Sequence, residues 1–124
     1  MDHSPGFLQL VNEGRTRVKE LNLDQARERL KANRQAVLVD VREDREWEAG
    51  HAIEARHLGK GILERDIEQM FPDKNTELIM YCGGGFRSVL TAEVAQRMGY
   101  TNVFSLAGGY KAMKAAYWPM SSGG

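Results

Sequence analysis

The 124-residue sequence has little of several things that other classes of protein require. It contains one cysteine, Cys82, so it can form neither an internal disulfide nor a cysteine-rich zinc site. Its longest apolar runs are about five residues, far short of the roughly 20 that a membrane-spanning helix needs. Net charge is also absent, because 17 Lys and Arg residues balance 17 Asp and Glu residues. The charge balance gives no global field that favours nucleic acid or an anionic membrane, and we expect neither partner.

Two further absences concern localisation and cofactors. The amino terminus lacks the basic and apolar regions of a secretory signal, which predicts a cytoplasmic protein. The three histidines are not spaced as a metal cluster with acidic partners, so we expect no metal and no cofactor. A chain of this length buries roughly two-thirds of its unfolded surface, which suffices for one domain with one crevice. Most of the functional question therefore concerns Cys82.

Predicted strands and helices alternate along the chain about five times, with short connections. This alternation predicts an α/β domain with a mostly parallel sheet and helices on both faces. We expect a helical extension at residues 1–16, which either covers the domain or meets a second copy, the domain itself at 17–118, and a flexible tail at 119–124. The predicted strands are 18–21, 36–41, 52–58, 76–81 and 102–106, and the predicted helices are 5–15, 23–30, 44–50, 62–71, 86–98 and 108–116.

Cys82 stands where the buried strand 76–81 ends, and three glycines follow it. In open α/β sheets, ligands bind outside the carboxyl ends of the strands. The glycines let backbone N–H groups converge on an anion, and the helix expected from about Phe86 adds free N–H groups and the positive end of its dipole. A thiol in this place is expected to ionise readily and to act as a nucleophile, with Arg87 as the cation within reach. The simpler alternative is an inert buried cysteine before a tight turn, although a turn needs one or two glycines rather than three.

Four segments, in this order, resemble the signatures of the single-domain rhodanese-like sulfurtransferase family, and the resemblance spans about residues 17–118. The resemblance implies a three-layer α/β/α domain whose five-stranded parallel sheet has the order 1-5-4-2-3. The cysteine loop then follows the fourth strand, and the second strand ends beside it at Asp40. The four segments are Leu38–Glu43, Glu46–His51, Tyr81–Ser88 and Gly99–Gly109.

The resemblance also implies an activity and roles for particular residues. Cys82 would take the outer sulfur of a donor such as thiosulfate, carry it as a persulfide, and pass it to a thiophilic acceptor such as cyanide or a thiol. Arg87 would face the anionic donor, and Ser88 would cap the helix. Asp40 and Arg42 would form a polar brace beneath the loop, either as a structural ion pair or as a direct catalytic part. The residues expected to bind substrate are Gly83, Gly84, Gly85, Phe86, Arg87 and Ser88.

Two other functions stay open. A non-enzymatic persulfide carrier or sulfur-sensing module, fed by a sulfur-relay protein, would show negligible thiosulfate turnover. A phosphatase or arsenate reductase is disfavoured by the length of the loop. Cell-cycle phosphatases that share the rhodanese fold place five residues between cysteine and arginine, whereas four residues, 83–86, lie between Cys82 and Arg87. The shorter loop makes a smaller ring of N–H donors, which suits one sulfur atom better than a tetrahedral phosphate.

Overall fold

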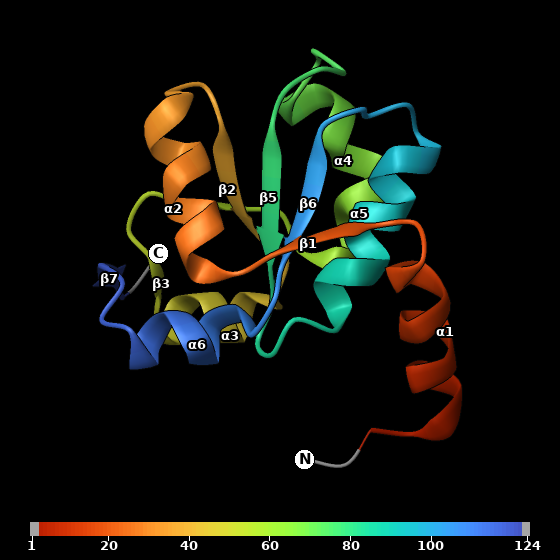
Figure 1. Cartoon of the computed structure of the whole chain (residues 1–124), viewed down its shortest axis with the longest axis horizontal. Coiled ribbons are helices and arrows are strands. Elements are labelled where there is room, and N and C mark those ends of the chain that lie inside the picture. The colour runs from red at the N-terminus through yellow and green to blue at the C-terminus, as the bar shows by residue number, and fades with distance from the viewer. Residues whose placement is uncertain (1–2, 123–124) are drawn as a thin grey trace.

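Five parallel strands form the centre of the structure, a computed structural model that describes residues 3–122 (Figure 1). Their spatial order is β1-β6-β5-β2-β4, and every neighbouring pair is parallel. When these strands alone are numbered along the chain, the order is 1-5-4-2-3, so the expected topology is confirmed. The strands are β1 (Lys19–Leu21), β2 (Val37–Asp40), β4 (Arg56–His57), β5 (Leu78–Tyr81) and β6 (Val103–Leu106).

Helices cover both faces of this sheet, and each face has its own apolar core (Figure 1). Within β5, Leu78 and Met80 belong to one core, whereas Ile79 and Tyr81 belong to the other. This alternation explains why the strand is apolar at successive positions. One face carries α1 (Pro5–Arg15), α4 (Leu63–Met70) and α5 (Arg87–Arg97). The other face carries α2 (Leu23–Ala32) and α6 (Gly109–Ala115). The short helix α3 (Asp44–Ala49) follows β2, and the 3-10 helix η1 (Lys60–Ile62) precedes α4.

Local sequence signals set several helix ends. Pro5 occupies the first position of α1, where its fixed φ suits the helix and its missing N–H is not needed. Asn22 caps α2, because its side chain accepts the Gln25 N–H at 2.8 Å while the Gln25 side chain accepts the Asn22 N–H at 2.8 Å. Helix α4 ends at Met70, two residues before Pro72.

Helix α1 packs along α5 of its own domain. Val11 is fully buried in the core on this face. A Cβ atom on Gly14 would lie only 2.9 Å from the Val89 side chain, so the two helices approach closely at this glycine. Arg17, just after α1, pairs with Glu93 at 2.7 Å. The amino-terminal helix therefore covers the domain, and its first residues lie toward the edge at which β5 ends (Figure 1).

The segments 52–58 and 119–124 differ from the expectation. The expected strand 52–58 is divided: β3 (His51–Ala52) pairs antiparallel with β7 (Met120–Ser121), and only β4 joins the main sheet. Part of the expected flexible tail is therefore a paired strand. Its position follows from Trp118, which is 4% exposed and belongs to one of the two cores, so the chain is fixed just before β7. Residues 123–124 of the expected tail lie outside the described part of the chain.

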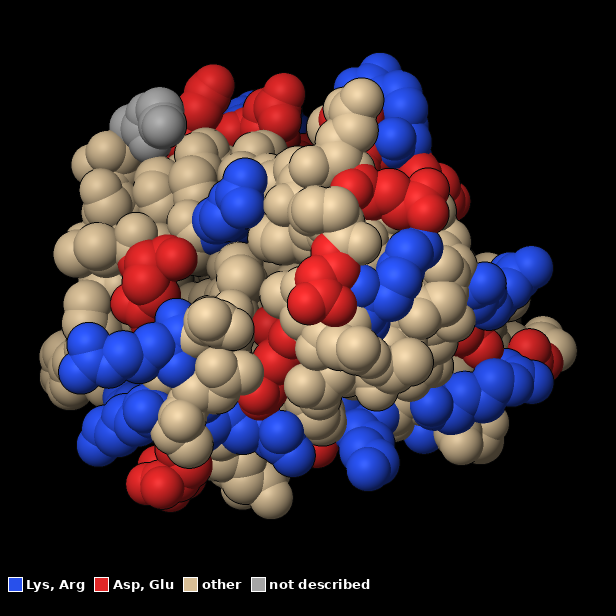
Figure 2. All heavy atoms as spheres, turned by 90° about the horizontal axis from the view of Figure 1, so that it is seen from above, with Lys and Arg blue, Asp and Glu red and all other residues tan. Residues whose placement is uncertain are grey.

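The mixture of basic and acidic side chains on the surface agrees with the balanced net charge of the sequence (Figure 2). Across residues 3–122, no helix combines the length and the apolar character needed to cross a membrane. Figure 2 shows the molecule from the top of Figure 1, and in this view basic and acidic side chains alternate over the surface. This face therefore offers no broad region of one sign of the kind that nucleic acids bind.

Candidate active site

Cys82 lies directly after β5, at the carboxyl edge of the sheet, and is 1% exposed. Its Sγ atom accepts the backbone N–H of Gly85 at 3.2 Å and that of Ser88 at 3.4 Å. Helix α5 begins at Arg87, so the Ser88 N–H is one of the donors that have no partner within the first turn of a helix. The structure therefore brings together the cysteine, two N–H donors directed at its sulfur and the positive end of a helix.

The three glycines of the loop differ in what their backbone requires. Gly85 has a φ of +95°, and a Cβ atom there would lie 2.9 Å from the backbone N of Gly108. Gly83 and Gly84 are not among the positive-φ glycines, and a Cβ on Gly84 would meet nothing within 4 Å. Of the three glycines, only Gly85 has both a backbone conformation and a close neighbour that disfavour a side chain.

The start of α6 holds the cysteine loop from the side opposite α5. The Tyr110 N–H donates to the Cys82 carbonyl at 2.7 Å, and the Lys111 N–H donates to the Gly83 carbonyl at 3.1 Å. A Cβ on Gly109 would lie 2.5 Å from the Cys82 carbonyl oxygen, so a glycine is needed for this approach. The start of α5 therefore holds the loop at the Cys82 sulfur, and the start of α6 holds it at the carbonyl groups of Cys82 and Gly83.

Two buried serine hydroxyls lie behind the sulfur. The Ser88 hydroxyl is 3.6 Å from the Cys82 Sγ atom and 2.7 Å from the Ser105 hydroxyl, and both serines are fully buried. The expectation that Ser88 caps the helix is wrong, because Phe86 occupies the N-cap and Ser88 lies inside the helix with its hydroxyl turned toward the core. Ser105 was not among the predicted site residues; its signal in the sequence is a single polar residue in the otherwise apolar strand β6.

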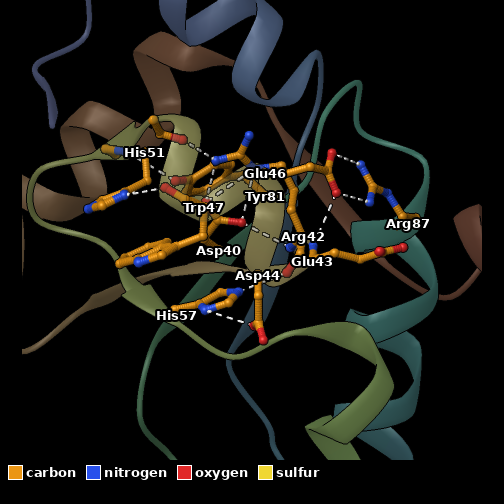
Figure 3. A network of polar contacts seen from close by, with 12 residues as sticks. Asp40, Arg42, Glu43, Asp44, Glu46, Trp47, His51, His57, Tyr81 and Arg87 are labelled. Carbon is orange, nitrogen blue, oxygen red and sulfur yellow. Dashed lines mark hydrogen bonds and ion pairs between the residues drawn. The ribbon is translucent and has the colours of Figure 1, made fainter. Parts of the chain in front are cut away.

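Arg87 forms a bidentate ion pair with Glu46 of α3, with distances of 2.8 and 3.0 Å (Figure 3). Hydrogen bonds from Arg87 are the main cause that lowers the pKa of Glu46 from 4.5 to about 2, and the Glu43 N–H adds to the effect. The same pair raises the pKa of Arg87. Arg87, which was expected to face an anionic donor, therefore has its charge compensated by a carboxylate at the same site.

Asp40 and Arg42 form a second, deeply buried ion pair. Arg42 donates to the Asp40 carboxylate at 2.8 Å and to the Gly50 carbonyl at 2.6 Å (Figure 3). Asp40 is 0% exposed and Arg42 is 4% exposed. Next to them, burial raises the pKa of Tyr81. Within residues 3–122, no hydrogen bond joins this pair to the loop 82–88; the pair ties the end of β2 to the turn after α3.

Trp47 holds α3 in place from its other side. Its ring stacks on His51, with centroids 3.4 Å apart, and on His57, with centroids 4.7 Å apart (Figure 3). His57 also bonds to the Arg42 carbonyl at 2.8 Å. The stack and the buried ion pair together fix the helix that presents Glu46 to Arg87.

A pocket of about 610 Å³ opens above Cys82. Four of the predicted site residues line it, whereas Gly83, Gly85, Ser88 and the pair Asp40–Arg42 are not part of its lining. Its other lining residues were not predicted as site residues, and some of them come from α1 and from the start of α6. Among residues 3–122 there is no group of three or more potential metal-ligating side chains. The lining residues are His3, Phe7, Glu46, Cys82, Gly84, Phe86, Arg87, Gly108 and Lys111.

A five-stranded parallel sheet in this order, with a cysteine cradled by N–H groups after its fourth strand, is the arrangement of rhodanese-like proteins. The sequence profile described as "Rhodanese-like domain" matches residues 22–116. This match covers most of the chain, and the chain belongs to the rhodanese-like domain family.

Individual proteins are similar to this chain over much of its length. The chain is 35% identical to the uncharacterized protein YqhL of Bacillus subtilis over 63% of its own length and 60% of that protein. It is 33% identical to the thiosulfate sulfurtransferase GlpE of Coxiella burnetii over 66% of its length and 75% of that protein. A solved structure from Rhodopseudomonas palustris, described as a protein of unknown function and possible tyrosine phosphatase, superposes with a TM-score of 0.85 at 28% identity over 98% of both chains.

Proposed function

We propose that this protein is a sulfurtransferase that moves sulfane sulfur through a persulfide on Cys82. The observation that carries the proposal is the pair of N–H donors, from Gly85 and Ser88, that meet the Cys82 sulfur at the floor of an open pocket. The sulfurtransferase name of a relative that is 33% identical supports the same activity. The small-molecule donor would be a compound such as thiosulfate, and the acceptor would be cyanide or a thiol.

The first half-reaction moves one sulfur atom onto the enzyme. The Cys82 thiolate attacks the outer sulfur of thiosulfate, a new S–S bond forms, and the bond between the two thiosulfate sulfurs breaks. Sulfite leaves with the electron pair of that bond, and the enzyme retains a persulfide anion. The N–H groups that held the thiolate, together with the positive end of α5, then stabilise this anion.

The second half-reaction returns the enzyme to its starting state. The acceptor attacks the outer persulfide sulfur, the S–S bond to Cys82 breaks, and the thiolate is regenerated. With cyanide the product is thiocyanate. Because the first product leaves before the acceptor reacts, we expect ping-pong kinetics.

Two alternatives predict different behaviour. A persulfide carrier or sensing module would accept sulfur from a sulfur-relay protein and would show negligible thiosulfate turnover. A phosphatase would need Arg87 for its phosphate, but here Arg87 pairs with Glu46, and only four residues separate it from Cys82. The short loop makes a smaller ring of N–H donors, which suits one sulfur atom better than a tetrahedral phosphate, so the loop length favours sulfur transfer.

The intact mass of the protein tests the proposal. We expect the mass to increase by one sulfur atom after incubation with thiosulfate and to return to its starting value when cyanide is added. Cys82→Ser is expected to keep the fold and to lose both the adduct and turnover. No adduct with thiosulfate, but an adduct from a persulfide-loaded protein, would favour the carrier. Phosphatase activity that disappears in Cys82→Ser would contradict the proposal.

A further inference from the structure

The amino-terminal segment forms an aromatic wall of the Cys82 pocket. The rings of His3 and Phe86 have centroids 4.4 Å apart, and those of Phe7 and Phe86 are 6.4 Å apart and nearly parallel, at 16°. His3 and Phe7 are also close to each other, with centroids 5.2 Å apart. All three residues line the pocket that contains Cys82. The wall thus joins a residue of the cysteine loop to two residues that precede the main domain in the sequence.

This wall is fixed by the packing of α1. Val11 is fully buried between α1 and the domain, and Gly14 approaches Val89 closely. Phe7 is one turn before Val11 on the same helix, so anchoring Val11 also places the Phe7 ring. Arg15 lies 5.0 Å from the centre of the Phe86 ring, which further restrains this ring.

The pocket is larger and more apolar than an inorganic sulfur compound requires. Its volume of about 610 Å³ is within the range of roughly 300–1,000 Å³ that is typical for organic ligands. Thiosulfate and cyanide are small polar anions, which gain nothing from two phenyl rings. On the other side of the pocket, the charge of Arg87 is compensated by Glu46, and Lys111 is a further cationic side chain that lines the pocket.

We propose that His3 and Phe7 are specificity-determining residues, and that they make the Cys82 pocket select an organic thiol or its persulfide, with an apolar group that packs on the aromatic wall. This inference rests on the proposed function and names the substrate class of the same site. Its chemistry is a transfer without net oxidation. The thiolate of the organic thiol attacks the outer sulfur of the Cys82 persulfide, the enzyme S–S bond breaks, and the organic persulfide leaves as the Cys82 thiolate is restored.

The test compares an organic acceptor with cyanide. Thiosulfate is the donor, and kcat/KM is measured for benzyl mercaptan and for cyanide in the wild-type chain, Phe7→Ala and His3→Ala. We expect kcat/KM for benzyl mercaptan, divided by kcat/KM for cyanide, to fall about tenfold in Phe7→Ala and severalfold in His3→Ala. The reason is that a lost apolar contact in a pocket discriminates between substrates by roughly 10- to 200-fold. Leu10→Ala is the matched control, since Leu10 is on the same helix, is 55% exposed and does not line the pocket; its ratio should equal that of the wild type. An unchanged ratio in Phe7→Ala, or an equal fall in Leu10→Ala, would overturn the inference.

A second measurement does not depend on sulfur transfer. Cys82 is the only cysteine, so its alkylation rates by iodoacetamide and by the N-benzyl derivative report on the pocket alone. We expect the wild-type chain to prefer the benzyl reagent and Phe7→Ala to lose that preference. If the wild type has no such preference, the pocket assignment is wrong. If the preference is found but no acceptor receives sulfur, the proposed function fails while the aromatic wall remains supported.

Discussion

Arg87 on α5 holds the carboxylate of Glu46 on α3 through two hydrogen bonds, of 2.8 and 3.0 Å. The two residues are 41 positions apart in the sequence, and each belongs to the first turn of a helix that follows a strand of the sheet. Strands β2 and β5 are neighbours, so the helices that follow them start at the same edge. The pair thus joins two separate loops beside Cys82 and neutralises a cation there.

The Glu46–Arg87 pair is predicted to make the free energy of unfolding depend on pH in the acid range. The pKa of Glu46 is about 2 in the folded protein, below its ordinary value of 4.5, so its contribution is complete above the ordinary value and is lost as the pH falls toward 2. Because both side chains are about one-third exposed, we expect Glu46→Gln to cost only about 0–1 kcal/mol near neutral pH. Urea denaturation at about pH 6 and about pH 3 should show the difference from wild type shrinking at the lower pH. A difference that is the same at both values would contradict this role.

The buried pair Asp40–Arg42 is predicted to support stability rather than the chemical step. Asp40→Ala leaves Arg42 buried without its carboxylate and is expected to cost about 3–5 kcal/mol in the free energy of unfolding. The double variant Asp40→Asn with Arg42→Met removes both charges and should cost less than the single change. Denaturant unfolding measures both values. A loss of turnover in Asp40→Ala without a loss of stability would instead assign Asp40 to catalysis.

The loop glycines provide a matched pair of variants. Gly85→Ala places a Cβ 2.9 Å from the Gly108 nitrogen at a φ of +95°, so we expect it to displace the loop and to reduce turnover at least tenfold. Gly84→Ala adds a methyl group that meets nothing within 4 Å, so we expect a folded protein whose stability changes by less than about 0.5 kcal/mol. Thermal unfolding and turnover of both variants are the measurements. Equal effects in the two variants would show that the conformation of Gly85 is not what the loop requires.

The two serine hydroxyls behind the sulfur are predicted to support its reactivity. In the thiolate state Ser105 can donate to Ser88 and Ser88 can donate to the Cys82 sulfur, which is a charge-assisted hydrogen bond. We expect Ser105→Ala to slow alkylation of Cys82 by iodoacetamide at neutral pH about three- to tenfold, because the Ser88 hydroxyl is then free to turn away. Ser105→Thr keeps a hydroxyl and should restore much of the rate. An alkylation rate that is unaffected in Ser105→Ala would rule out this relay.

The amino-acid pattern was sufficient for the α/β class and for the position of Cys82 at the end of a buried strand, whereas the strand order came from the family resemblance. Strand β5 is apolar at all four positions and β2 is apolar until Asp40 at its end, and such strands fit the centre of a sheet covered on both sides. The glycines after Cys82, followed by a helix, predicted N–H donors at the sulfur, and those of Gly85 and Ser88 are there. These are local properties, because a few adjacent residues fix the backbone and the backbone fixes its own N–H groups.

The partners of the charged and polar side chains were decided by the tertiary structure. Arg87 could have faced solvent, substrate or any nearby acid, and it pairs with Glu46 because β2 and β5 are adjacent. Ser105 lies behind the sulfur because β6 pairs with β5 on its other side. Phe7 lines the pocket because α1 packs on α5. In each case residues far apart in sequence meet only after the sheet orders its strands. Adjacent residues therefore determined the loop and the N–H donors around Cys82, whereas three-dimensional packing determined the surroundings of that loop.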